Sequence, residues 1–406
     1  MIQNWPNAVA HVDADYFYAN CELARNPQLR GKPVMVFGRL DTCILAKTPE
    51  AKKMGITTAI PSWEAKKLCP NGIYIKGDFR YYTLISRQLM QILKEWSPEV
   101  EVYSVDEAFM DMNGLRGMYR KSYPQLGDMI RQQVQTNLGI TVSVGISVNK
   151  TLAKMACEIN KPNATTVVNG KQIKEFLSQI PVREVPGIGF SREALLKKYR
   201  VETCQQLAEL PESFVHRLFG KMGILLWREL RGELSFPITP YPPPPKTIGR
   251  TSSFDTPVKD IRKVEGLAFF HLERALQSLH RNQLLAGEIS LYLRDKPFRN
   301  YCFPYRFATP TMDFFKLAEH LGKLIREIPA GQLWRSAGVM LDRLSPAENL
   351  QFDLFEGADR ALKSEKVMHA KAKLNERYGQ HAVRSGSTLF MNENCSKKER
   401  MGMPLL

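Results

Sequence analysis

Two adjacent carboxylates, Asp106 and Glu107, interrupt a strand-like run, VYSVDEAFM. A third carboxylate, Asp13, ends an earlier apolar run, AVAHVD. Carboxylates gathered in a sheet are unstable unless cations neutralise their charge. Magnesium suits them, because it takes hard oxygen ligands and keeps room for water and substrate phosphate. Two such ions about 3.5–4 Å apart stabilise the attacking and leaving oxygens of a phosphoryl displacement. The three residues are therefore candidates for a site that holds two Mg²⁺ ions.

The spacing leaves two alternatives open. On a regular strand Asp106 and Glu107 point to opposite faces, so both reach one site only if the chain turns or bulges between them. Without such a site, the pair is an exposed turn between two strands. Asp15 shares the face of Asp13 on a straight strand, so the pattern also leaves Asp15 open as a ligand.

The charge of the chain points to a polyanionic partner. The 406 residues include 57 Lys and Arg against 41 Asp and Glu, which gives a net charge of +16. Seven of the excess positive charges fall within residues 150–250, after the acidic pair. A basic protein of this size often binds a polyanion, although excess charge can also serve solubility alone. We expect one region to hold metals and another to bind phosphate groups.

The cysteines indicate a reducing compartment. All seven lie far apart, and no C-x-x-C pair occurs, which argues against a zinc site or a disulfide framework. The N-terminus lacks the basic start and apolar core of a signal peptide, and no apolar run has the length needed to cross a bilayer. We therefore expect a cytoplasmic protein without a membrane partner.

The elements that must position the carboxylates interleave over the first 170 residues. Strands are expected at 8–13, 31–38 and 141–147. A helix is expected at 81–96, where apolar residues recur every three or four positions and Ser97-Pro98 follows. This alternation predicts an α+β sheet with helices on one face.

The rest of the chain divides into three parts. Residues 171–235 are expected to be mostly helical, with two glycines in a tight turn before a basic helix. Residues 237–246, PITPYPPPPK, contain six prolines and are expected to form a semi-rigid extended linker. Residues 247–345 have the pattern of a separate mixed domain, and a polar tail follows.

Four motifs carry a resemblance to a known family: HVDADYFYANCE, YSVDEAFMD, VSVGISVNKTLAKMACEINKPNA and EVPGIG. In this order and spacing they resemble the Y-family (translesion) DNA polymerases, from about residue 8 to about residue 345. The resemblance implies an α+β right-hand polymerase with palm, fingers and helical thumb, and a separate α/β little-finger domain. It implies these boundaries: palm 1–16 and 79–168, fingers 17–78, thumb with a helix-hairpin-helix 169–235, linker 236–246, little finger 247–345, and a tail at 346–406.

The implied activity is template-directed DNA synthesis past lesions, in which deoxynucleoside triphosphates extend the 3′ end of a primer. By the resemblance, Asp13 and Asp106 match the metal-bridging aspartates and Glu107 matches the third carboxylate. The backbone carbonyl of Ala14 completes one of the two Mg²⁺ sites.

The resemblance also assigns residues to the incoming nucleotide. Tyr18 matches the steric gate, an aromatic ring that occupies the space of a ribose 2′-hydroxyl, and Tyr16 and Phe17 lie beside it in the sequence. Lys161 matches a lysine that reaches the triphosphate. Without the resemblance, core packing is the favoured explanation of Tyr18, and a solvated helix end explains Lys161.

One segment departs from the family pattern. Many relatives have Asn-Tyr-x-Ala-Arg where this chain has residues 48–52, TPEAK. Pro49 replaces a tyrosine that hydrogen-bonds phosphate. Lys52 replaces an arginine and supplies charge without the bidentate fork, so it stays a candidate triphosphate ligand. The departure weakens an assignment to the DNA polymerase IV branch, since other branches, including the catalytic subunit of DNA polymerase V, also lack that tyrosine.

Contacts to DNA are expected in two regions. Gly187 and Gly189 in PGIG resemble a helix-hairpin-helix turn whose backbone N–H groups face a DNA phosphate, although an ordinary glycine turn has the same sequence. In the little-finger region, Arg250, Arg294 and Lys296 are expected to contact the DNA backbone without reading its sequence.

The tail contains a short candidate interaction motif. Residues 351–355, QFDLF, resemble the peptide that docks in the bacterial sliding clamp. Gln351, Leu354 and Phe355 would be its anchors, unless the two apolar side chains pack back on the little finger.

Two other functions compete with a polymerase. A nucleotidyl cyclase on a palm-like sheet would not need the basic helical region or the last domain. A polymerase-like adaptor that binds DNA and recruits repair partners would not need the carboxylates, and all three are present.

Overall fold

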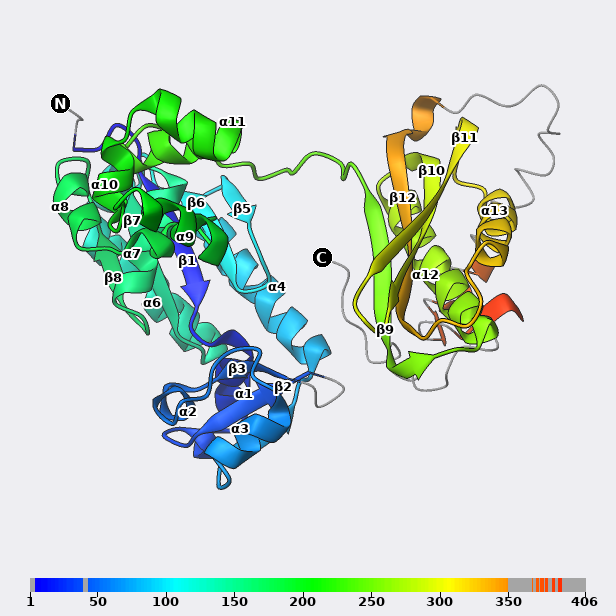
Figure 1. The fold of residues 1–406 in the computed structure, drawn as a ribbon. Helices are drawn as coiled ribbons and strands as arrows, with labels where there is room; N and C mark the ends of the chain where they lie inside the picture. The colour runs from blue at the N-terminus through cyan, green and yellow to red at the C-terminus, as the bar shows by residue number, and fades with distance from the viewer. Residues whose placement is uncertain are drawn as a thin grey trace. The chain divides into compact units, whose positions relative to one another are not determined.

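The computed structural model describes residues 4–38 and 43–349 and a discontinuous set of residues between 367 and 388 (Figure 1). The chain forms two compact units, and the break between them falls between Pro242 and Pro243, inside the proline-rich segment. Among the described residues, no helix combines the length and the apolar character that crossing a membrane requires.

A five-stranded sheet forms the centre of the first unit, in the order β5-β6-β1-β7-β8. Its central strand β1 pairs antiparallel with both β6 and β7, and β8 pairs parallel with β7. The strands are β1 (Val9–Ala14), β5 (Val100–Val102), β6 (Glu107–Asp111), β7 (Val142–Ser147) and β8 (Thr165–Val167).

Two long helices, α4 (Phe79–Trp96) and α6 (Tyr123–Leu138), cover one face of this sheet. The even-numbered side chains of β1, such as Ala10 and Val12, are fully buried against them. Helix α4 begins where Asp78 caps the backbone N–H of Tyr81 and ends before Ser97-Pro98, as the sequence pattern predicts. A short helix, α5 (Leu115–Tyr119), precedes α6.

A third helix, α7 (Lys150–Ile159), lies on the opposite face, so the prediction of helices on one face only is wrong. The reason is Gly145 in β7. A Cβ atom built on Gly145 would lie 2.1 Å from the carbonyl oxygen of Ala153 in α7. Without a side chain at position 145, the backbone of α7 can approach the sheet closely.

A small three-stranded sheet, in the order β3-β2-β4, has a separate core. Its elements are α1 (Phe17–Arg25), β2 (Val34–Phe37), β3 (Ile44–Lys47), α2 (Pro49–Lys53), α3 (Ser62–Leu68) and β4 (Ile73–Lys76). The buried Thr48 hydroxyl accepts a hydrogen bond from Val34 N (3.1 Å) and donates one to Lys32 O (3.0 Å). Pro49 follows as the first residue of α2, where its missing N–H costs no helical hydrogen bond.

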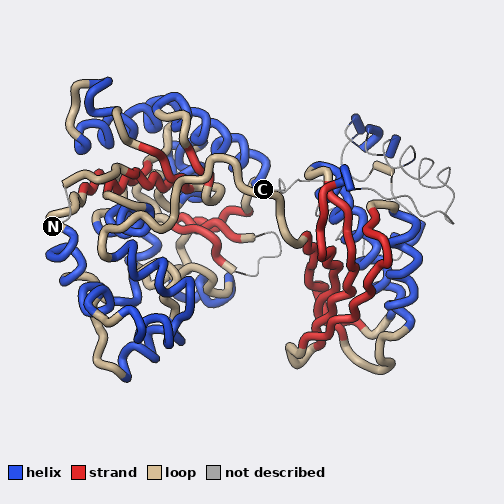
Figure 2. The backbone as a smooth tube through the Cα atoms, turned by 90° about the horizontal axis from the view of Figure 1, so that it is seen from above, coloured by secondary structure: helices blue, strands red, loops and turns tan. Residues whose placement is uncertain are grey.

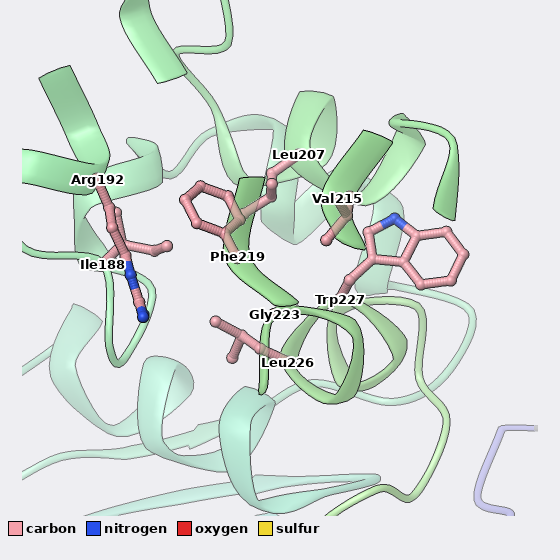
Figure 3. A pocket seen from close by; sticks show the side chains of 8 residues that line it. All are labelled: Ile188, Arg192, Leu207, Val215, Phe219, Gly223, Leu226 and Trp227. Carbon is pink, nitrogen blue, oxygen red and sulfur yellow. The ribbon is translucent and has the colours of Figure 1, made fainter. Parts of the chain in front are cut away.

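A helical subdomain continues from α7 and contains α8 (Ile173–Ser178), α9 (Phe190–Lys198), α10 (Cys204–Glu209) and α11 (Glu212–Leu230). Its core includes Leu152 and Met155 of α7, so α7 joins this subdomain to the five-stranded sheet. Figure 3 shows side chains from this subdomain around an apolar crevice of about 10 Å³. Space of this size fits about one water molecule, so the crevice is a packing gap and not a ligand site.

The start of the linker is fixed to the first unit by two carboxylates. Glu229 in α11 is fully buried and accepts hydrogen bonds from Thr151 N (2.9 Å), Ser235 N (3.1 Å) and Phe236 N (3.0 Å). Glu101 in β5 pairs with Lys150 (2.6 Å) and accepts a hydrogen bond from Thr239 N (2.7 Å). The chain is therefore held up to Thr239.

The second unit is a four-stranded antiparallel sheet in the order β11-β10-β12-β9, and both of its long helices lie on the same side of the sheet (Figure 2). The elements are β9 (Ile248–Val258), α12 (Ile261–Arg281), β10 (Leu284–Asp295), β11 (Asn300–Thr311), α13 (Phe314–Arg326) and β12 (Trp334–Pro346). Ile289, Leu291 and Leu293 of β10 are buried under the helices, while the alternating Tyr292 and Arg294 lie on the other face.

Some described residues of the tail also pack on the helices of this unit. Lys371 Nζ lies 2.5 Å from the nearly buried carboxylate of Glu273 in α12. Asn375 is buried, and its amide closes a loop by hydrogen bonds to both backbone groups of Val383 (2.8 and 3.1 Å). These contacts extend the second unit beyond β12.

Candidate metal and nucleotide site

Strand pairing brings the predicted carboxylates to one end of the central sheet. Asp13 near the end of β1 lies directly opposite Glu107, the first residue of β6. Asp106 belongs to the turn between β5 and β6, and its carbonyl accepts a hydrogen bond from Ala14 N (2.8 Å). The backbone N–H groups of Tyr103 and Ser104 both donate to Glu107 O (3.0 Å each), which closes the turn. The chain therefore turns at the acidic pair, as a common site requires.

Each of the three carboxylates has one oxygen held by the protein itself. Lys161 Nζ lies 2.8 Å from Asp13 Oδ2, and the Ser104 hydroxyl donates to Asp106 Oδ1. Glu107 Oε2 accepts from His11 Nε2 (2.8 Å) and from Lys154 Nζ. The remaining oxygens, Asp13 Oδ1, Asp106 Oδ2 and Glu107 Oε1, have no hydrogen-bond partner among the described residues.

The electrostatics of the site indicate a place for a cation. Burial raises the pKa of Asp13 to about 7, although Lys161 opposes this effect. Burial also acts to raise the pKa of Glu107, but the hydrogen bonds from His11 and Lys154 outweigh it and lower that pKa to about 2. A bound divalent ion would favour the ionised form of Asp13. The donor set is made of hard carboxylate oxygens and fits a divalent ion such as Mg²⁺.

Only two of the three carboxylates belong to the closest cluster of potential metal ligands. Ligand atoms of His11, Asp13 and Glu107 lie within 4.8 Å of one another. Asp106 lies outside this group, with its Oδ1 held by Ser104, but its charge contributes to the raised pKa of Asp13. The structure thus brings Asp13 and Glu107 together directly and places Asp106 beside them.

Asp15, which the sequence left open as a ligand, has a structural role. It is buried, and its two oxygens accept hydrogen bonds from Ser143 Oγ (2.7 Å) and from Asn163 N (2.8 Å). Both oxygens are used, so Asp15 is not a metal ligand here. By holding Asn163, it fixes the segment just after Lys161.

Aromatic packing fixes the ring of Tyr18. Tyr18 stacks on Tyr82 of α4 with ring centroids 4.8 Å apart, and it meets the edge of Phe79 at 5.6 Å. Burial raises the pKa of Tyr18, and the nearby charge of Asp106 adds to the shift. Of its neighbours, Phe17 is buried and Tyr16 has a left-handed backbone (φ 39°) just before α1. Tyr18 therefore presents a rigid, half-buried ring close to the carboxylates.

The two candidate triphosphate lysines lie in different surroundings. Lys161 is ion-paired with Asp13 and with Glu158 (2.6 Å) at the end of α7. Lys52 is exposed near the end of α2. Burial, with a contribution from the charge of Lys52, lowers the pKa of Lys47 in β3, which donates to Thr58 Oγ1 (2.7 Å). Lys161 thus lies at the carboxylate site, while Lys52 belongs to the small sheet.

The glycine turn has the backbone that its sequence predicts. Gly187 has a φ of +90°, which favours glycine, and Gly189 comes directly before α9. Arg192 donates from Nη1 to Gly187 O (2.7 Å) and braces the turn. The next side chain, Phe190, is 91% exposed.

The candidate DNA contacts of the second unit lie on different faces. Arg250 is turned toward α12, where its Nη2 donates to Ser278 Oγ (2.5 Å). Arg294 lies on the face of the sheet without helices, and its Nε donates to Asn300 Oδ1 (2.7 Å). Lys296 is exposed just after β10. The tail motif with Gln351, Leu354 and Phe355 lies outside the described residues.

Sequence reasoning missed three residues of the site: His11, Ser104 and Lys154. The signal for His11 was available, since it lies two residues before Asp13 and shares its face of β1. Lys154 lies within α7, and nothing in the sequence pattern links it to Glu107. Ser104 gave no signal beyond its place in the turn.

Comparisons with known proteins agree with the geometry. The chain matches the impB/mucB/samB family at residues 12–158 and the C-terminal domain of that family at residues 245–354. A DNA polymerase IV of Desulfatibacillum aliphaticivorans is 30% identical over 380 residues, which cover 93% of this chain and 96% of the relative. DNA polymerase IV of Moorella thermoacetica is 31% identical over 93% of this chain and 95% of the relative, and DNA polymerase IV 1 of Bacillus subtilis is 30% identical over 96% and 95%.

A solved structure shares the fold. A Y-family DNA polymerase chimera superposes with a TM-score of 0.70 and covers 84% of this chain and 99% of its own, at 24% sequence identity. The three sequence relatives are named DNA polymerase IV, the branch to which Pro49 weakens an assignment. At the level of the family they agree with the resemblance. The two matched domains, the full-length relatives and the shared fold show that the chain belongs to the Y family of translesion DNA polymerases.

Proposed function

We propose that this lesion-bypass DNA polymerase uses Asp13, Asp106 and Glu107 to hold two Mg²⁺ ions at the incoming deoxynucleotide. Use of a divalent metal follows from the family; the choice of Mg²⁺, the number of ions and the residues belong to the proposal. The observation that carries it is the one oxygen left without a hydrogen bond on each carboxylate at the ends of β1 and β6. When bound, the ions supply positive charge to the attacking and leaving oxygens of the transferred phosphoryl group.

The protein supplies a rigid frame for this chemistry. Asp13 and Glu107 are held on paired strands, and Ser104 holds Asp106 in the turn. The carbonyl of Ala14 ends β1 beside them and is a further candidate ligand, since the Ala14 N–H is tied to the Asp106 carbonyl (2.8 Å). Such fixed donors need little reorganisation when the charge of the transition state develops.

The nucleotide is proposed to lie between the carboxylates and the small sheet. Tyr18, held by Tyr82 and Phe79, would exclude a 2′-hydroxyl, with Tyr16 and Phe17 forming the backbone bend behind it. Lys161 keeps its proton. Burial acts to lower its pKa, but the charge of Asp13 and the hydrogen bonds to Asp13 and Glu158 together outweigh burial and raise that pKa. Its ammonium would turn from Asp13 toward the triphosphate, and Lys52 would add a second positive charge.

The remaining parts follow the family architecture. We assign the five-stranded sheet to the palm, the three-stranded sheet to the fingers, the helical subdomain to the thumb and the second unit to the little finger. Backbone groups at Gly187 and Gly189, together with Arg250, Arg294 and Lys296, are the proposed DNA contacts. Because Arg250 is turned toward α12, it would have to move before it could reach a phosphate.

Two further points belong to the proposal. The tail motif with Gln351, Leu354 and Phe355 would bind a sliding clamp, which would keep a polymerase near the primer end. A cytoplasmic location fits a DNA substrate and the scattered cysteines. The competing role as a catalytically weak adaptor is not favoured, because relatives named as polymerases match over nearly the whole chain and the carboxylates are intact.

Primer extension with Asp106→Ala tests the proposal. Loss of a metal ligand should cost about 4 kcal/mol of transition-state stabilisation, or about a thousandfold in rate. Binding of a primed template, measured by fluorescence anisotropy, should change little, because DNA is held mainly by the thumb and little finger. Glu95→Ala removes an exposed carboxylate of the same unit and serves as control. Extension by Asp106→Ala at the parental rate would refute the assignment.

A further inference from the structure

His11 lies beside the proposed metal site and contacts Glu107, one of the three carboxylates. It is on β1, two residues before Asp13 and on the same face, and its side chain is 0% exposed. Its Nε2 atom is 2.8 Å from Glu107 Oε2. Its Nδ1 atom is buried without a hydrogen-bond partner among the described residues. A buried polar atom without a partner is unusual, so the arrangement calls for a reason.

The partners of the ring decide where its proton lies. A carboxylate can only accept hydrogen bonds, so the contact with Glu107 requires a hydrogen on Nε2. A second hydrogen on Nδ1 would be buried with no acceptor, which is unfavourable. The geometry therefore describes a neutral imidazole that donates from Nε2 to Glu107.

The ring is held in this direction by its surroundings. The Phe109 ring lies 4.7 Å from the His11 ring, centroid to centroid, on the paired strand β6. Lys150 Nζ lies over the Phe109 ring, 4.9 Å from its centre. On the remaining side, His11 pairs with Gly145, over which α7 passes. The imidazole is thus fixed more firmly than Lys154, whose side chain is 22% exposed and reaches the same oxygen.

We propose that His11 is a positioning residue that makes Glu107 a one-oxygen metal ligand. Its hydrogen bond occupies Oε2 and leaves Oε1 for the ion, so the carboxylate cannot turn to offer both oxygens. The inference rests on the proposed role of Glu107 as a ligand. Its consequence is selectivity: Mg²⁺ demands near-octahedral geometry, whereas Ca²⁺ accepts more ligands and bidentate carboxylates. A Glu107 that is free to turn would favour Ca²⁺ relative to Mg²⁺.

Two substitutions separate the hydrogen bond from the packing. His11→Phe keeps a ring of similar size but has no donor. His11→Gln keeps a donor that can reach Glu107. Loss of an orienting partner of a metal ligand typically weakens metal binding about 10- to 100-fold. We expect about a tenfold loss of affinity in His11→Phe and much less in His11→Gln.

The measurement uses binding as well as activity. The full chain is bound to a primed template with a dideoxy-terminated primer and the matching deoxynucleotide, so that no turnover occurs. Free Mn²⁺ is followed by electron paramagnetic resonance, and Mg²⁺ or Ca²⁺ is added as a competitor. In His11→Phe, Mn²⁺ should bind more weakly and the ratio of Ca²⁺ to Mg²⁺ affinity should rise. In extension assays, the Mg²⁺ concentration for half-maximal rate should rise in the same order.

The outcomes distinguish this inference from the proposed function. Parental Mn²⁺ affinity and an unchanged Ca²⁺ to Mg²⁺ ratio in His11→Phe would overturn the inference. If that variant does not fold, His11→Asn replaces it, because its shorter amide stays polar but falls short of Glu107; parental metal binding there has the same meaning. Glu107→Gln is the separate test of the metal site. If Glu107→Gln binds Mn²⁺ like the parent, the proposed function itself fails at this residue.

Discussion

Replacing Gly145 with alanine should displace α7, the helix that carries Lys154 and leads to Lys161. The new Cβ would lie 2.1 Å from Ala153 O, 2.3 Å from Cys157 N and 2.8 Å from Cys157 Cα. All three are backbone atoms of α7, so none can swing aside as a side chain would. Since real Cβ contacts are essentially never shorter than 3.0 Å, α7 must move by about 1 Å.

The size of the effect follows from this displacement. Overpacking a well-filled core costs about 1–3 kcal/mol. We expect the upper end, about 3 kcal/mol, because the three atoms that clash are all backbone atoms of α7. Lys154 follows Ala153 in α7, and Lys161 lies just beyond its end, so both would leave their carboxylates. A 1 Å misplacement can reduce a rate about a hundredfold.

Urea unfolding and single-nucleotide incorporation measure the two effects. Tryptophan fluorescence reports mainly on the first unit, because four of the five tryptophans, at positions 5, 63, 96 and 227, lie there. Gly117→Ala is the matched control, since Gly117 is exposed in α5 and a Cβ there meets nothing within 4 Å. That control should be as stable as the parent or up to about 1 kcal/mol more stable. If Gly145→Ala unfolds at the parental urea concentration and retains the parental rate, α7 does not pack on the sheet as described.

Three further predictions concern other parts of the chain. Tyr18→Ala should raise ribonucleotide relative to deoxyribonucleotide incorporation in single-nucleotide kinetics, because the ring held by aromatic packing is lost; unchanged discrimination would exclude the gate. Glu229→Gln should lower the stability of the first unit in urea by about 2–3 kcal/mol, because the new amide N–H would face backbone N–H groups from which the carboxylate accepts hydrogen bonds; an unchanged urea midpoint would contradict these hydrogen bonds. Replacing Gln351, Leu354 and Phe355 together with alanine should leave clamp-free extension unchanged and abolish stimulation by a loaded clamp, whereas parental stimulation would mean that the motif matches by chance.

The candidates for the carboxylate site were predictable because they depend on local pattern. Alternation places Asp13 and Asp15 on one face of their strand, and Asp106 and Glu107 reach a common site if the chain turns between them. The position of α7 was not, because it depends on contact between a strand and a helix. A signal was nevertheless present: Ser143 and Gly145 place small side chains on one face of β7, where a helix can approach.

Long-range partners explain the other differences. His11 meets Glu107 across 96 positions of the sequence, so its role appears only when β1 and β6 are placed in register. Arg250 looked like a free basic residue in a polar strand. In the fold it lies on the same face of β9 as the buried Ile248, and this face packs on α12. Alternation of residue types shows that the two faces of a sheet differ, but it does not show which face the helices cover.

The anchoring of residues 235–239 by Glu229 and Glu101 sets the length of the tether between the units. Only residues 240–247 remain free before β9, and in an extended proline-rich conformation these eight residues reach about 25 Å. A short, stiff tether keeps the effective concentration of one unit high near the other, and that concentration falls as the tether lengthens. Breaking the two anchors would release residues 235–239 into the tether. The tether would then gain five residues, although the number of residues in the chain stays the same.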